Sequence, residues 1–189
     1  MLFTSLRHAL THLIHFRGRD NPALFWPFAG LVIGAVMVLG MIGALVAMVQ
    51  LAPRIIALAQ AQAEQTRMGN EPGGLPLDPA MFKQFVDTAV AVNAISLILV
   101  VVLLGAAITR RLHDSAMPGF IAWIPALLMV IGMAHMGDAF AGTGPMPVDP
   151  AVFARTSLIN LAYLASLGGL VYLLARKGTP GENRYGPAR

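Results

Sequence analysis

Residues 88–109 read TAVAVNAISLILVVVLLGAAIT, and no ionisable side chain interrupts the run. Because a helix rises about 1.5 Å per residue, this stretch is long enough to cross the roughly 30 Å hydrocarbon core of a bilayer. Lipid offers no partners to free backbone N–H and C=O groups, so a spanning segment must be helical. The stretch therefore predicts a transmembrane helix.

Three further apolar runs of comparable length predict spans at residues 28–51, 116–136 and 156–175. Only 12% of the 189 residues are charged and 57% are hydrophobic, whereas soluble domains usually carry about 25% charged residues. We therefore expect an all-α integral membrane protein, a four-helix transmembrane bundle that forms a single domain over residues 1–189. Residues 54–67 predict a helical extension of the first span beyond the bilayer.

Four spans place the N-terminus, the 109–115 segment and the C-terminus on one side of the membrane. That side carries most of the basic residues, namely Arg7, Arg17, Arg19, Arg110, Arg111, Arg176, Lys177, Arg184 and Arg189. This Lys/Arg excess predicts that both termini, including the tail at residues 176–189, are cytoplasmic. The net charge of +4 does not indicate nucleic-acid binding, because the basic residues lie at the ends of apolar spans.

Residues 2–15 predict a separate amphipathic helix. Leucine, phenylalanine and isoleucine recur there at helical spacing, and Arg7 and several histidines occupy the other face. The segment is too short and too polar to span a bilayer, so it is expected to lie along the cytoplasmic interface. Packing against the cytoplasmic ends of the bundle is the alternative, and the two placements are compatible.

A short pattern occurs twice, as PLDPAMF at residues 76–82 and as PVDPAVF at residues 147–153. Aspartate followed by proline is an efficient helix start, because the carboxylate accepts from a free N–H and proline has none to lose. The pattern is explained either by two such starts or by two duplicated helical hairpins that run in parallel.

The interior of the predicted bundle offers little chemistry. Between their ends the four spans contain no Asp, Glu, Lys or Arg, which argues against a pump or an ion-coupled transporter. Gly30 and Gly34 allow close helix approach, either within one molecule or in a homo-oligomer. The chain has no cysteine and no cluster of metal ligands, so we expect neither a metal nor a cofactor.

The residues with charged or hydrogen-bonding side chains are concentrated in three segments on the predicted cytoplasmic side. They read FRGR at residues 16–19, RRLHD at residues 110–114 and GTPGENRYGP at residues 178–187. With these motifs the sequence resembles the DUF805 family of small bacterial inner-membrane proteins, and the resemblance covers the whole topology. It implies a fold and a location in the bacterial inner membrane, and it does not imply an activity.

Topology brings the three motifs to one face, where five arginines can surround a single site: Arg17, Arg19, Arg110, Arg111 and Arg184. One interpretation is a structural latch that pins the tail to the 110–114 segment. Asp114 and Glu182 would be its counter-ions, and His113, Asn183 and Tyr185 would belong to it. The protein would then be a non-enzymatic structural or interaction protein.

The alternative is a small transporter, channel or lipid-handling protein whose arginines bind an anion or a phospholipid headgroup, since the guanidinium fork suits phosphate and carboxylate. Either way, anionic phospholipid is the expected partner at this face. No catalytic residues are predicted, because the sequence has no paired carboxylates and no nucleophile motif. Adjacent His113 and Asp114 would point about 100° apart on a helix and form no dyad by being neighbours.

Overall fold

A computed structural model of the chain describes residues 2–69, 79–140 and 149–187. Its elements are α1 (Leu2–Thr11), α2 (Pro22–Arg67), α3 (Pro79–Asp114), the short 3-10 helix η1 (Gly119–Ala122), α4 (Trp123–Phe140) and α5 (Pro150–Ala175). No strand occurs among these described residues, so the prediction of an all-helical protein is confirmed.

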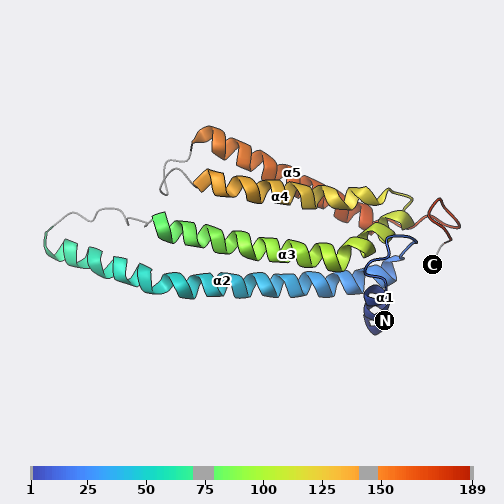
Figure 1. Cartoon of the computed structure of the whole chain (residues 1–189), viewed down its shortest axis with the longest axis horizontal. Coiled ribbons are helices and arrows are strands. Elements are labelled where there is room, and N and C mark those ends of the chain that lie inside the picture. The colour runs from blue at the N-terminus through green and yellow to red at the C-terminus, as the bar shows by residue number, and fades with distance from the viewer. Residues whose placement is uncertain (1, 70–78, 141–148, 188–189) are drawn as a thin grey trace.

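Two antiparallel helix pairs make up the body of the molecule (Figure 1). Helix α2 packs along α3, and α4 packs along α5. The two pairs meet mainly through α3, which contacts both α4 and α5. Both termini lie at the same end of this elongated bundle, here called the terminal end, and α1 lies across it (Figure 1).

Three helices are long and apolar enough to cross a membrane: α2, α3 over Lys83–Asp114, and α5. The chain is thus a multi-pass membrane protein. The segment predicted as a span at residues 116–136 divides into η1 and α4, and its apolar part, Gly119–His135, is shorter. The 18 residues of α4 measure about 27 Å, close to the hydrocarbon thickness of about 30 Å. Four crossings remain a prediction.

Helix α2 begins where local chemistry favours a start. The side chain of Asn21 accepts a hydrogen bond from the Leu24 N–H at 3.0 Å, and Pro22 occupies the first turn. The helix is 46 residues long and continues through Pro53 to Arg67, so the prediction that residues 54–67 extend the first span as a helix is confirmed, and their place beyond the bilayer stays a prediction. The helix also begins earlier than the predicted span at residue 28.

Helix α1 ends at Thr11, within the predicted segment 2–15. Ser5 and Ala9 are buried against the bundle, as the packing alternative predicts. Within α1, the Phe3 side chain is 84% exposed and the Leu10 side chain 50% exposed. Ile14, just beyond the helix, is 82% exposed. This uncovered apolar side is what an interfacial helix needs.

The two Asp-Pro helix starts fare differently. Asp149 caps α5, because its carboxylate accepts from the Ala151 N–H at 2.8 Å and Pro150 opens the helix. That start is confirmed. Its counterpart Asp78 lies outside the described residues, and α3 begins at Pro79. Parallel duplication of the hairpins stays a prediction.

Because the chain contains no cysteine, single-cysteine variants test the four crossings directly. We choose the exposed positions Gln65, Ala154 and Glu182. With four spans, a membrane-impermeant maleimide added to intact cells should label Gln65→Cys and Ala154→Cys, and should label Glu182→Cys only after lysis. If α4 does not cross, Ala154→Cys becomes protected and Glu182→Cys becomes accessible.

Candidate functional site

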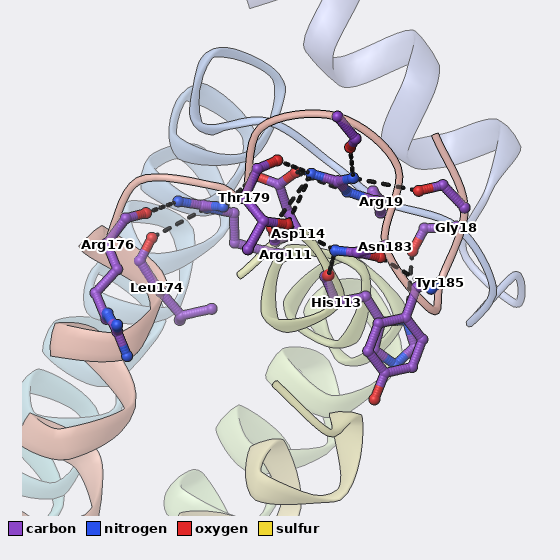
Figure 2. Close-up of polar contacts among 12 residues, drawn as sticks. Gly18, Arg19, Arg111, His113, Asp114, Leu174, Arg176, Thr179, Asn183 and Tyr185 are labelled. Atoms are coloured by element: carbon purple, nitrogen blue, oxygen red, sulfur yellow. Dashed lines mark hydrogen bonds and ion pairs between the residues drawn. The ribbon is translucent and has the colours of Figure 1, made fainter. Parts of the chain in front are cut away.

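Five charged residues form a buried cluster at the terminal end: Arg19, Asp20, Arg110, Arg111 and Asp114. None of them is more than 4% exposed. They come from the link between α1 and α2 and from the last turn of α3. We call this group the buried ion cluster, and Figure 2 shows the half of it that surrounds Asp114.

Asp114, the last residue of α3, joins two arginines. Its Oδ1 accepts from Nε of Arg19 at 3.1 Å and from Nη2 at 2.9 Å, while its Oδ2 accepts from Nη1 of Arg111 at 2.6 Å. Charge-assisted hydrogen bonds of this kind are about twice as strong as neutral ones. One carboxylate therefore holds the α1–α2 link to α3.

A second ion pair connects the same segments from the other side. Nε of Arg110 donates to Oδ2 of Asp20 at 2.8 Å, and the Asp20 N–H donates to the Arg110 carbonyl at 3.2 Å. Oδ1 of Asp20 lies 3.0 Å from Nε2 of His8. Helix α1 is thereby connected to the end of α3 through Asp20.

The remaining arginine donors satisfy carbonyls at helix ends, which lack partners within their own helices. Nη1 of Arg110 donates to the carbonyls of His12, at 2.8 Å, and His15, which follow α1. Arg111 donates from Nε to the Leu174 carbonyl at 3.0 Å and from Nη2 to that of Arg176, at the end of α5. Cations at helix C-termini also meet the negative end of the helix dipole.

Arg19 is surrounded by the tail. Its Nη1 donates to the carbonyls of Gly181, at 2.7 Å, and Gly186, at 3.2 Å, and its Nη2 donates to the Thr179 carbonyl at 2.6 Å. Together with the two bonds to Asp114, every nitrogen of the guanidinium has an acceptor. The tail is thus folded around a side chain from the other end of the chain (Figure 2).

The tail also contacts the 110–114 segment directly. The Thr179 N–H donates to the Asp114 carbonyl at 2.8 Å. Nδ2 of Asn183 donates to the His113 carbonyl at 3.0 Å and to Oγ1 of Thr179 at 2.8 Å. The rings of His113 and Tyr185 stack with centroids 3.7 Å apart and planes 8° from parallel (Figure 2).

Gly178 allows the tail to approach the carboxylate. A Cβ atom at this position would lie 2.1 Å from Oδ2 of Asp114 and 2.6 Å from its Cγ, closer than any real contact. Any other residue would push the carboxylate or the tail aside. Gly178 therefore sets the distance between the tail and the buried ion cluster.

The structure brings together seven of the ten residues that sequence analysis named for the site: Arg19, Arg110, Arg111, His113, Asp114, Asn183 and Tyr185. The other three lie at its edge. Arg17 and Glu182 are exposed and form no ion pair with any described residue. Arg184 donates to the Ala116 carbonyl at 3.2 Å and lies 4.7 Å from the centroid of the Tyr185 ring.

Asp20 was not predicted from the sequence, and it occupies the counter-ion position that Glu182 was expected to fill. The available signal was the excess of five arginines over the two expected counter-ions, Asp114 and Glu182. His8 and Thr179 were not predicted either. His8 is one of several histidines on an amphipathic helix, and nothing within the 178–187 motif marks Thr179 as an acceptor for Arg19.

The helices are long enough to cross a bilayer, and buried ion pairs hold them together at one end. These features define a multi-pass helical membrane protein. The chain belongs to the DUF805 family, whose description is "Protein of unknown function"; the family model matches residues 13–187. No curated protein and no solved structure matches the chain.

We expect Gly178→Ala to destabilise the protein by about 1–3 kcal/mol, the usual effect of forcing a methyl group into a filled site. The neighbouring Lys177→Ala, which truncates an exposed side chain, is the matched control. Thermal unfolding followed by tryptophan fluorescence in detergent should show a lower Tm for Gly178→Ala alone. Equal Tm values for the two variants would contradict the close approach of the tail to Asp114.

Proposed function

We propose that this protein is a non-enzymatic structural or interaction protein of the bacterial inner membrane, with four spans and both termini in the cytoplasm. On this proposal the tail is a latch, held by the buried ion cluster so that the three motifs form one fixed cytoplasmic face. The observation that carries it is Arg19, whose guanidinium is bonded both to Asp114 and to three carbonyls of the tail.

Burial of the cluster supports the latch. Three arginines and two aspartates leave one excess positive charge away from water, which is costly unless each group is hydrogen-bonded. The helix-end and tail carbonyls supply that compensation. The docked tail supplies three carbonyl acceptors to Arg19, and hydrogen bonds to a charged group usually contribute about 1.5–3 kcal/mol each, which favours the docked tail.

The exposed cations around the latch support an interaction surface. Arg7, Arg17, Arg176 and Lys177 are exposed, and no ion pair joins any of them to a described residue. Arginine and lysine at a cytoplasmic membrane surface are attracted to anionic phospholipid headgroups. We propose anionic phospholipid as the partner of this face.

The alternative is a transporter, channel or lipid-handling protein with an arginine-lined anion site. It requires Arg19, Arg110 and Arg111 to exchange their internal acceptors for a ligand. Arg17 and Arg184 are the exposed arginines of that set. Because Arg19, Arg110 and Arg111 are already hydrogen-bonded within the protein, we favour the latch.

The variant Asn183→Ala tests the latch, and the neighbouring substitution Glu182→Ala is its matched control. Asn183 of the tail donates one hydrogen bond to the His113 carbonyl of α3 and one to Oγ1 of Thr179 within the tail, each worth about 0.5–1.5 kcal/mol, whereas Glu182 forms no ion pair with any described residue. In hydrogen exchange with the protein in nanodiscs, the opening equilibrium of residues 178–187 should rise about tenfold in Asn183→Ala. It should not change in Glu182→Ala.

Equal exchange in both variants and the wild type would mean that the tail is not held by these contacts. The latch proposal would then be wrong.

A further inference from the structure

The two helix pairs leave a cleft between them, with a volume of about 700 Å³. All four long helices line it, and its walls include Ile33 and Met37 of α2, Val100 of α3, Met129 of α4 and Leu167 of α5. The pairs meet mainly through α3, so α2 and α5 stand on opposite sides of the cleft. We call it the interhelical cleft.

The lining excludes polar and charged ligands. No charged side chain lines the cleft. Its few polar groups include Asn93 and Thr88, and these donate within their own helix, to the carbonyls of Ala89 and Gln84, each at 2.8 Å. A polar ligand would lose its hydration here and find few partners. An apolar chain fits without this penalty.

The cleft opens sideways. Among its lining side chains, Met37 is 65% exposed, Val171 47% and Phe85 46%. These residues lie on helices long and apolar enough to cross a membrane, so the medium at the opening is the hydrocarbon of the bilayer. The molecules available to enter it are membrane lipids.

One end of the cleft differs in character from the rest. Trp26 and Trp123 line it and are 38% and 41% exposed, as indole rings at a membrane interface commonly are. Leu174 of α5 also lines the cleft, and the exposed Arg176 and Lys177 follow it after Ala175. The Arg176 side chain extends along α5 and away from Asp114 (Figure 2). Cations therefore border the end that lies beside the buried ion cluster.

The half of the cleft nearest the terminal end matches a single acyl chain. There all four long helices line the cleft, and on α5 the lining runs from Leu174 to Tyr163, about 17 Å, which is close to half of the 30 Å hydrocarbon core. On α2 and α3 the lining continues to Ala47 and Phe85, toward the other end of the bundle. The helix of a second copy over that length would occupy a cylinder of roughly 1,300 Å³, too large for the cleft. The volume falls within the range of roughly 300–1,000 Å³ for apolar ligand pockets.

We propose that the interhelical cleft binds one acyl chain of an anionic phospholipid from the leaflet at the terminal end, with the phosphate beside Arg176 and Lys177. The chain enters sideways from the bilayer and fills the space that the two helix pairs leave open. This site is separate from the buried ion cluster, and it does not require the tail to be released.

The test uses the full-length protein in vesicles of phosphatidylcholine and phosphatidylglycerol, with photoreactive acyl chains on one lipid at a time. Phosphatidylglycerol should label peptides that carry lining residues of α3, α4 and α5 more strongly than outward-facing residues at the same depth. Ala126→Phe places a bulky ring where all four long helices line the cleft, and it should lower that labelling about tenfold. Ala165→Phe, an exposed position of α5 outside the lining, is the matched control and should have no effect.

A second variant covers the case in which Ala126→Phe does not fold. Arg176→Gln combined with Lys177→Gln changes exposed side chains alone, and it should remove the preference for phosphatidylglycerol over phosphatidylcholine. Uniform labelling of all helix faces, or equal labelling by both lipids in the wild type, would overturn the proposal.

Discussion

The bond on which the rest of the structure depends is the bidentate sharing of the Asp114 carboxylate between Arg19 and Arg111. Attraction between opposite charges is strong in a buried environment, but removing the charges from water costs nearly as much, so geometry decides the balance. Here the geometry is favourable, because each oxygen faces a different guanidinium and the backbone carbonyl of the same residue accepts from Thr179. One residue at the end of α3 therefore fixes the positions of the α1–α2 link, α3 and the tail.

The same arrangement explains why the molecule is closed at one end and open along its side. Arg110 and Arg111 are adjacent on α3, yet they donate to carbonyls at the ends of two other helices, α1 and α5. Polar contacts thus converge on the terminal end, whereas the two helix pairs meet mainly along α3. The interhelical cleft follows from this arrangement. Polar contacts join the two helix pairs at the terminal end, and the apolar sides of α2 and α5 remain apart along the rest of the bundle. The proposed latch and the proposed lipid site are two consequences of one architecture.

Hydrophobic runs predicted helices well, because a run without charges long enough to cross hydrocarbon has few alternatives to helix. The spans at residues 28–51, 88–109 and 156–175 lie inside α2, α3 and α5, while Pro118 and Gly119 interrupt the segment at residues 116–136 before α4 begins. A latch between the tail and the 110–114 segment was one interpretation of the motifs, and the structure has hydrogen bonds between these two segments. The motifs did not indicate which acid pairs with which arginine, because pairing depends on burial: Asp20 is 2% exposed, and Glu182, with a similar charge, points to solvent. Sequence spacing carries no information on that difference.

The most direct test is a double-mutant cycle between Arg19 and Asp114, with Arg19→Gln, Asp114→Asn and the combined variant unfolded in the same detergent. Removing one partner of a buried ion pair usually costs about 3–5 kcal/mol, because the other charge is left without compensation. The account predicts that the combined variant loses clearly less stability than the sum of the single losses, with a coupling of at least about 1 kcal/mol. Additive losses, or single variants as stable as the wild type, would contradict the claim that this ion pair organises the terminal end.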